Sequence, residues 1–111
     1  MVVVNLELGR PTAEYALIQL RQSLVSARAR GTATIKLIHG YGSSGKGGAI
    51  KGAVHRELAQ LKTSGKIKEY VPGDEFSPFY ANARRALELD PQLRKDMDYT
   101  RTNQGITIVV L

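Results

Sequence analysis

Residues 39–47, His-Gly-Tyr-Gly-Ser-Ser-Gly-Lys-Gly, have the types and the spacing of a site that binds phosphate. The glycines allow the backbone N–H groups to approach an anion closely, and the lysine adds positive charge. His39 can donate a hydrogen bond to a phosphate oxygen, or act as a general acid or base. The alternative for His39 is an imidazole bonded to a backbone carbonyl, and for Lys46 a solvated side chain.

The elements on either side of this loop would hold it in place. Residues 32–38 are rich in β-forming side chains and predict a strand. After the loop, Ile50, Val54, Leu58 and Leu61 recur at helical spacing and predict a helix that ends near Gly65. The first turn of that helix would direct unpaired N–H groups at the anion. The sequence therefore predicts a phosphate-binding loop between a strand and a helix.

The other elements predict an α/β fold in the order βαβαββ. Residues 2–8 predict the first strand, and Thr12 and Gly31 predict the start and end of the first helix. Residues 67–71 predict a short strand, and the almost wholly apolar run 105–111 predicts a central strand that is buried on both faces. In between, residues 74–104 predict helical segments at 82–89 and 91–97. The apolar side chains of this stretch are expected to pack onto the body, namely Phe76, Phe79, Tyr80, Ala83, Leu87, Leu93 and Met97.

The length and the net charge of the chain limit the number of domains and the kind of partner. The chain has 111 residues, which predicts a single domain over 1–111, and a net charge of +6. Residues 1–73 hold 11 Lys and Arg against 4 Asp and Glu, a net of +7, whereas residues 74–104 hold 5 against 6, a net of −1. A basic balance favours a polyanionic partner, DNA or RNA, although it also keeps a small domain in solution.

Several classes of protein are excluded by composition. There is no cysteine, which excludes a disulfide framework and thiolate chemistry and is compatible with the cytoplasm. The two histidines, His39 and His55, lack the spacing of metal ligands, and we expect His55 at the surface or boundary of the second helix. No apolar run approaches the ~18 residues of a membrane span.

Two nucleotide-binding motifs fit the loop only in part. Gly40 to Lys46 matches the start of a P-loop, but Gly47 stands where a Ser or Thr would hold Mg²⁺. Gly40, Gly42 and Gly45 also match a dinucleotide fingerprint. Its acidic partner is absent, because Glu69 lies within the third predicted strand rather than at its end. The chain is also short for either class of sheet.

The loop instead resembles the His-Gly-x-Gly loop of the small MutS-related (Smr) domain. Leu6-Glu7-Leu8 and Thr12 to Leu17 are similar to that family's first strand end and helix start, and residues 105–111 are similar to its last strand. The likeness covers residues 4–73 and 104–111, and residues 74–104 look like an insertion where the family has a shorter connection. The resemblance implies a two-layer fold with a mixed four-stranded sheet, in which the last strand is antiparallel and internal. It also implies binding of DNA or RNA, and some members cut them.

The first motif departs from the family pattern. Glu7 stands where the family has Asp, Gly9 where it has His, and Arg10 where it has Gly. The resemblance therefore implies binding more directly than catalysis. If the domain is an endonuclease, we expect His39 and Glu7 to be catalytic, with Mg²⁺ or Mn²⁺ as the cofactor; otherwise no cofactor and no bound metal are expected.

The expected nucleic-acid-binding residues are His39, Gly40, Tyr41, Gly42, Ser43, Ser44, Lys46, Gly47, Lys51 and Arg10. Tyr41 would either stack on an unpaired base or cover the core. The alternative function is a catalytically inactive protein-interaction module of the same fold, with residues 74–104 as the partner surface. The chain would be free-standing, part of a larger protein, or a homo-oligomer.

Overall fold

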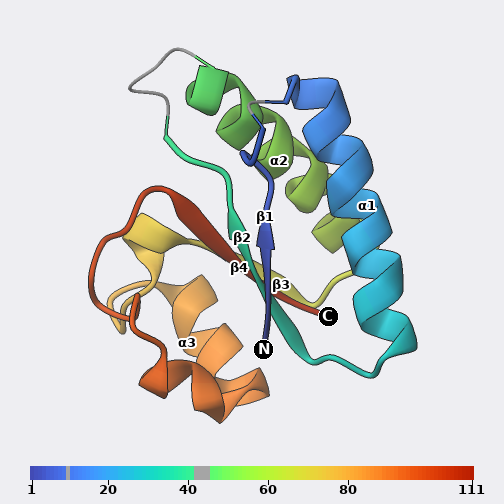
Figure 1. The fold of residues 1–111 in the computed structure, drawn as a ribbon. Coiled ribbons are helices and arrows are strands. Elements are labelled where there is room, and N and C mark those ends of the chain that lie inside the picture. The colour runs from blue at the N-terminus through green and yellow to red at the C-terminus, as the bar shows by residue number, and fades with distance from the viewer. Residues whose placement is uncertain (10, 42–45) are drawn as a thin grey trace.

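The computed structural model describes residues 1–9, 11–41 and 46–111. In chain order the elements are β1 (Val2–Asn5), α1 (Ala13–Ala29), β2 (Thr34–Ile38), α2 (Lys46–Thr63), β3 (Glu69–Pro72), η1 (Gly73–Glu75), α3 (Ala81–Leu89), η2 (Pro91–Lys95) and β4 (Ile106–Val110), where η denotes a 3₁₀ helix. Figure 1 shows α1 and α2 side by side on one face of the sheet and α3 on the other face. The predicted βαβαββ order is confirmed.

The sheet has the strand order β1-β2-β4-β3. β1 is parallel to β2, and β4 is antiparallel to both β2 and β3. All residues of β4 are buried, as predicted for an internal strand covered on both faces. The first strand ends at Asn5 rather than at residue 8, because the Asn5 side chain accepts a hydrogen bond from the Glu7 N–H (3.0 Å) and the chain turns. Likewise, the third strand covers 69–72 rather than 67–71.

Both long helices are bounded as the sequence predicts. The Thr12 hydroxyl accepts a hydrogen bond from the Tyr15 N–H (3.1 Å) and caps the start of α1. Gly31 (φ +71°) and Gly65 (φ +76°) follow α1 and α2 in the left-handed conformation that glycine adopts without strain. These ends fix the lengths of the two helices, and so fix where β2 and β3 begin.

The α1 and α2 layer buries one of two apolar cores. It contains Leu20 and Leu24 of α1, Val54 and Leu58 of α2, and side chains of the sheet such as Leu37. Burying one such side chain stabilises the fold by roughly 1.5–3 kcal/mol. This core holds the start of α2 against the end of β2, where the predicted phosphate loop lies.

The insertion covers part of the opposite face of the sheet. Phe76, Leu87 and Leu93 pack with Ile106 and Ile108 of β4 in a second core. The two-layer fold therefore has an added layer over β2, β4 and β3. The packing prediction holds for Phe76, Ala83, Leu87 and Leu93. It is wrong for Phe79, Tyr80 and Met97, which are 87%, 44% and 80% exposed.

A buried ion cluster also joins the insertion to the sheet. Lys36 of β2 donates to Asp98 (2.6 Å) and Asp96 (2.7 Å), and its side chain is only 7% exposed. On the same strand, the Thr34 hydroxyl donates to Asp90 (2.6 Å). Because residues 34 and 36 lie on one face of a strand, the insertion is fixed to that face by polar bonds as well as by apolar packing.

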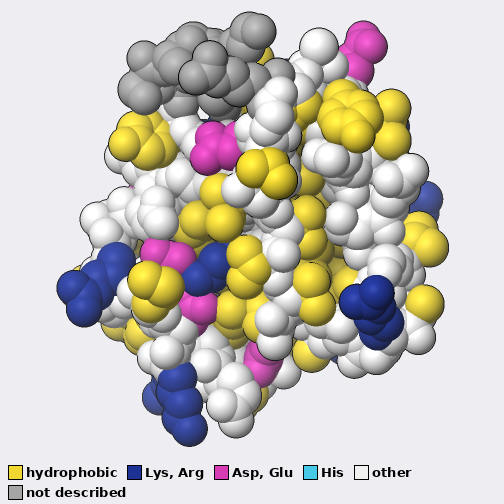
Figure 2. All heavy atoms as spheres, viewed as in Figure 1, with side chains coloured by type: hydrophobic (Ala, Val, Ile, Leu, Met, Phe, Trp, Pro, Cys, Tyr) yellow, Lys and Arg dark blue, Asp and Glu magenta, His cyan; other side chains and the backbone are white. Residues whose placement is uncertain are grey.

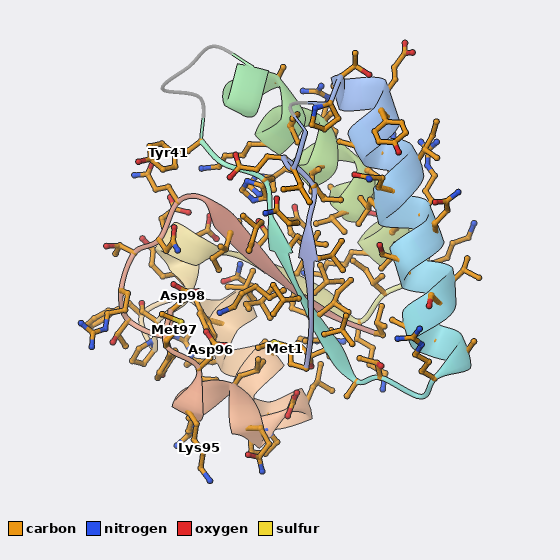
Figure 3. All side chains as sticks on the ribbon, viewed as in Figure 1. Met1, Tyr41, Lys95, Asp96, Met97 and Asp98 are labelled. Carbon is orange, nitrogen blue, oxygen red and sulfur yellow. The ribbon has the colours of Figure 1, made fainter. Side chains whose placement is uncertain are left out.

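Figure 3 shows Asp96, Met97 and Asp98 together on the segment of the insertion that lies beside the sheet.

No helix of the described residues is long and apolar enough to cross a membrane.

Candidate functional site

His39 lies at the end of β2, beneath the start of the predicted phosphate loop, and is fully buried. Its Nδ1 atom is 2.6 Å from the Gly40 carbonyl oxygen, and its Nε2 atom is 2.8 Å from the hydroxyl of Thr107. The same hydroxyl is 2.9 Å from Nε2 of His55 on α2. Three elements that are far apart in the sequence, β2, β4 and α2, therefore meet in one polar cluster, His39–Thr107–His55.

The chemistry of these groups fixes the direction of each hydrogen bond when His39 is neutral. A carbonyl oxygen only accepts, so Nδ1 of His39 carries the proton and Nε2 is an acceptor. The Thr107 hydroxyl then donates to His39 and accepts from the Nε2–H of His55. Every bond of the cluster has one donor and one acceptor, which is the condition for a stable buried polar network.

Burial favours these neutral forms. It lowers the pKa of His39, and the charge of Lys51 acts in the same direction, whereas the Gly40 carbonyl and Glu7 raise it. Burial also lowers the pKa of His55, to about 4, with further contributions from His39 and Lys51. Both imidazoles are therefore neutral at pH 7. Neither is a ready proton donor to solvent, and their hydrogen bonds serve to hold β4 and α2 together.

Gly40 is the first residue of the predicted loop, and it is tightly constrained. The N–H groups of His39 and Gly40 both donate to the Gly105 carbonyl (2.9 and 3.1 Å). Gly40 has φ +72°, and a Cβ placed on it would collide with Oε2 of Glu7. The carboxylate of Glu7 thus lies directly against the loop entrance. This position favours glycine for its backbone angle, whereas the exposed Glu7 side chain could move away from a Cβ.

The N-terminal turn of α2 is the positive end of the dipole of that helix. It contains no acidic residue, whereas the first turn of α1 contains Glu14. Gly45, which precedes α2 in the sequence, has no side chain that could cap it. Lys51 lies one turn into the helix, half-buried, near enough to the polar cluster for its charge to act on both histidines. A helix start of this kind attracts an anion.

The described residues thus bring together His39, Gly40, Glu7 and Lys51 at one end of the sheet. Tyr41 lies beside them, 61% exposed, with its ring in reach of Gly105. The predictions for Arg10, Gly42, Ser43 and Ser44 lie outside the described residues, as do those for the side chains of Lys46 and Gly47. Among the described residues, no group of three or more His, Asp or Glu side chains is arranged to hold a metal ion.

Sequence reasoning missed the parts that His55 and Thr107 play. His55 is half-buried and bonded within the cluster rather than being a simple boundary residue. Two signals could have found them. Thr107 is the one polar residue inside the apolar run 106–111, and His55 follows Lys51 by four positions, one helical turn.

Comparison with known proteins agrees with this geometry. No curated protein and no solved structure matches the chain. A family model, the Smr domain, matches residues 6–75, which run from the end of β1 through the loop and α2 to η1. The match ends where the predicted insertion begins. Because it spans more than half of the chain, the chain belongs to the Smr domain family.

Proposed function

We propose that this Smr domain binds DNA or RNA through its sugar–phosphate backbone, at the loop 39–47 and the start of α2. The observation that carries the proposal is the N-terminus of α2, which has no acidic residue in its first turn and has Lys51 beside it. The phosphate would accept hydrogen bonds from N–H groups of the first turn, and Lys46 and Lys51 would supply charge.

His39 supports this site from below in our proposal. Its imidazole is fully buried, so it would act by holding Gly40 and the end of β2 rather than by touching phosphate. The net charge of +7 over residues 1–73 would extend the footprint beyond the loop, with Arg10 as the nearest basic residue before α1. This distribution favours a long polyanion over a free nucleotide.

Fluorescence anisotropy with labelled structured DNA and RNA tests the proposal over a range of salt concentrations. Lys46→Ala and Lys51→Ala should each weaken binding to all sequences. They should lower the slope of log K against log salt by about 0.7–0.9, the value for one lost phosphate contact. The matched control is Lys68→Ala, because Lys68 is exposed and precedes β3. The start of β3 lies at the end of the sheet that is opposite to the loop. Equal salt slopes for the wild type and the three variants would contradict the placement of the phosphate at the loop and the start of α2.

Phosphodiester hydrolysis is a second candidate function, and the position of Glu7 favours it. Its carboxylate lies against Gly40 and acts on the His39 charge. Glu7 would be the protein ligand of a Mg²⁺ or Mn²⁺ ion, held otherwise by water and substrate oxygens, and the ion would activate a water molecule. Water would add to the phosphorus as the P–O bond to one sugar oxygen breaks. The proton of the water would pass to solvent and the leaving oxygen would take one from solvent, since His39 is enclosed.

Incubation with plasmid DNA and structured RNA tests this candidate, with each metal and with EDTA. We expect Glu7→Gln to abolish cleavage while binding is retained. Cleavage that survives in Glu7→Gln would remove Glu7 from the mechanism. If neither binding nor cleavage is found, the alternative of a protein-interaction module is favoured.

A further inference from the structure

An open pocket of about 420 Å³ lies on the insertion face of the sheet, beside the loop entrance. Its floor includes Ile38 and Ile106, which pair across β2 and β4. Gly40 and Tyr41 line one side, and Met97 of the insertion lines another. The volume is in the range of small-ligand sites, roughly 300–1,000 Å³. Every lining residue belongs to the described part of the chain.

Large apolar side chains stand exposed around this pocket. Tyr41 is 61% exposed and Met97 is 80% exposed, although both border a hollow that could have buried them. Figure 3 shows that Tyr41 extends from the end of β2 and Met97 from the insertion, on the same side of the molecule. Figure 2 shows hydrophobic side chains along this face, around a cluster of acidic and basic ones. An exposed aromatic ring next to an apolar floor is suited to stacking a flat ring.

The charges of the pocket disfavour phosphate and favour hydrogen-bond donors. Lys36 is already neutralised by Asp96 and Asp98, and Glu7 adds a further carboxylate at the rim. Asn103 is occupied too, since it donates to Asp98 (3.0 Å) and accepts from the Gly105 N–H (3.0 Å). Among the described residues, no side chain or N–H group forms a hydrogen bond with the Glu7 carboxylate. A carboxylate only accepts hydrogen bonds, so Glu7 at the rim suits a ligand that carries N–H donors.

We propose that this pocket receives an unpaired nucleobase that carries an amino group, from the strand whose phosphates the loop binds. The proposal rests on the proposed function. Tyr41 and Met97 would flank the base, and Glu7 would accept from its amino edge, as carboxylates do from nucleobases. In a duplex the base is stacked and its Watson–Crick edge is paired, so only an unpaired base can enter the pocket with that whole edge free.

One observation favours a nucleotide over other ligands, and a second concerns the origin of the lining residues. Gly40 belongs both to the pocket and to the loop, so a phosphate at α2 and a base in the pocket can belong to adjacent nucleotides of one strand. Moreover, Met97, Asp98 and Asn103 come from the insertion, which lies beyond the family match over 6–75. The pocket thus joins residues of the matched part, such as Glu7 and Gly40, to residues that lie outside it.

The test compares hairpins of one sequence that carry, at a single position, an unpaired guanine, an unpaired uracil, an abasic unit or a normal base pair. Binding is measured by anisotropy. We expect the guanine hairpin to bind about tenfold more tightly than the abasic and fully paired ones, in line with the contribution of one stacked base. Uracil, which lacks an amino group, should fall between guanine and the abasic unit.

Variants then assign the effect to the pocket. Tyr41→Ala and Met97→Ala should remove most of the advantage of an unpaired base, and Glu7→Gln should remove the preference for guanine over uracil. Phe79→Ala is the matched control, because Phe79 is 87% exposed on the insertion and does not line the pocket. The mutated side chains are largely exposed, so circular dichroism should show an unchanged fold.

The outcomes separate this proposal from the one on which it rests. Equal affinity for all four hairpins, still reduced by Lys51→Ala, would overturn the base pocket and leave the phosphate site standing. An advantage of the unpaired base that survives in Tyr41→Ala and Met97→Ala would also overturn the pocket. If no hairpin binds at low salt, both proposals fail.

Discussion

The imidazole of His39 and the hydroxyl of Thr107 form a fully buried hydrogen bond, with 2.8 Å between Nε2 and Oγ1. His55 of α2 bonds to the same hydroxyl at 2.9 Å. β2, β4 and α2 are thereby fixed to one another directly beneath the entrance of the loop. A rigid base of this kind is what a binding loop needs, because a ligand then meets backbone N–H groups that are already in place.

Replacing Thr107 by Val should remove the shared hydroxyl and leave two ring nitrogens unpaired. Each buried group without a partner costs about 1–3 kcal/mol, so we expect a loss of roughly 2–4 kcal/mol in the free energy of unfolding. Urea denaturation measures it. Thr107→Ser keeps the hydroxyl and should retain most of the stability. A small loss in Thr107→Val with a larger one in Thr107→Ser would mean that the methyl group, not the hydroxyl, matters.

Stability should also decrease between pH 7 and pH 5. The pKa of His55 falls to about 4 in the folded chain, chiefly through burial, with help from His39 and Lys51 and against the effect of Asp74. An unfolded histidine titrates near 6.5, so within this window the unfolded state binds more protons. The stabilisation is complete above pH 6.5 and is lost as the pH falls towards 4.

Urea titrations at several pH values check this dependence. Because His55 is only half-buried and solvent screens its charge, we expect a decrease of at most about 1 kcal/mol from pH 7 to pH 5. The depressed pKa values of Asp98 and Glu57 act at lower pH and should contribute little there. His55→Gln should flatten the profile. A profile that is already flat in the wild type would contradict the neutral cluster.

Lys36→Met should destabilise the insertion strongly. Burial acts to lower the pKa of Lys36, but the hydrogen bonds of Asp96 and Asp98 outweigh it and hold the pKa above its ordinary value. Removing the ammonium leaves two buried carboxylates together, at a cost of about 3–5 kcal/mol. The triple variant Lys36→Met, Asp96→Asn, Asp98→Asn should regain much of the loss. The control is Lys68→Met, because Lys68 is exposed. If the free energy of unfolding of Lys36→Met lay within about 0.5 kcal/mol of that of the control, a structural role for the cluster would be refuted.

Gly40→Ala should cost about as much as the same change at Gly65. Both glycines have a left-handed backbone, at φ +72° and +76°, which costs another residue about 1–2 kcal/mol. Nothing surrounds a Cβ at Gly65, and at Gly40 the nearest atom is Oε2 of Glu7, the end of an exposed and flexible side chain that can move aside. The additional Glu7→Ala change should therefore alter the cost at Gly40 by little. A much larger loss at Gly40 than at Gly65, measured by urea denaturation, would contradict this and would mean that Glu7 is held against the loop.

Most of the fold can be predicted from the sequence because its signals are local. Thr12 and Gly31 mark a helix by cap chemistry, and the spacing of Val54 and Leu58 marks the buried side of α2. The apolar run at 106–111, interrupted by Thr107 alone, predicts an internal strand because both of its faces must be covered. Each inference needs only neighbouring residues and the period of one element.

The remainder depends on contacts between distant segments. His55 and Thr107 lie 52 positions apart, and nothing local to either one reveals their shared hydrogen bond. Lys36 in a central strand is explained only by Asp96 and Asp98, some 60 positions later. Met97 was expected in the core on hydrophobicity alone, but the neighbouring aspartates turn to Lys36 and Met97 remains exposed. An apolar side chain in an insertion can line a site rather than fill a core.

The central claim is that nucleic acid binds at the loop and the start of α2. The most direct measurement is the change in amide NMR signals of the ¹⁵N-labelled chain when a structured oligonucleotide is added. We predict that the largest shifts occur at Gly40, Tyr41 and the first turns of α2 including Lys51, with little change at Gly31 or Lys68 at the opposite edge of the sheet. Shifts confined to α3 and η2, with none at Gly40 or Lys51, would contradict the account.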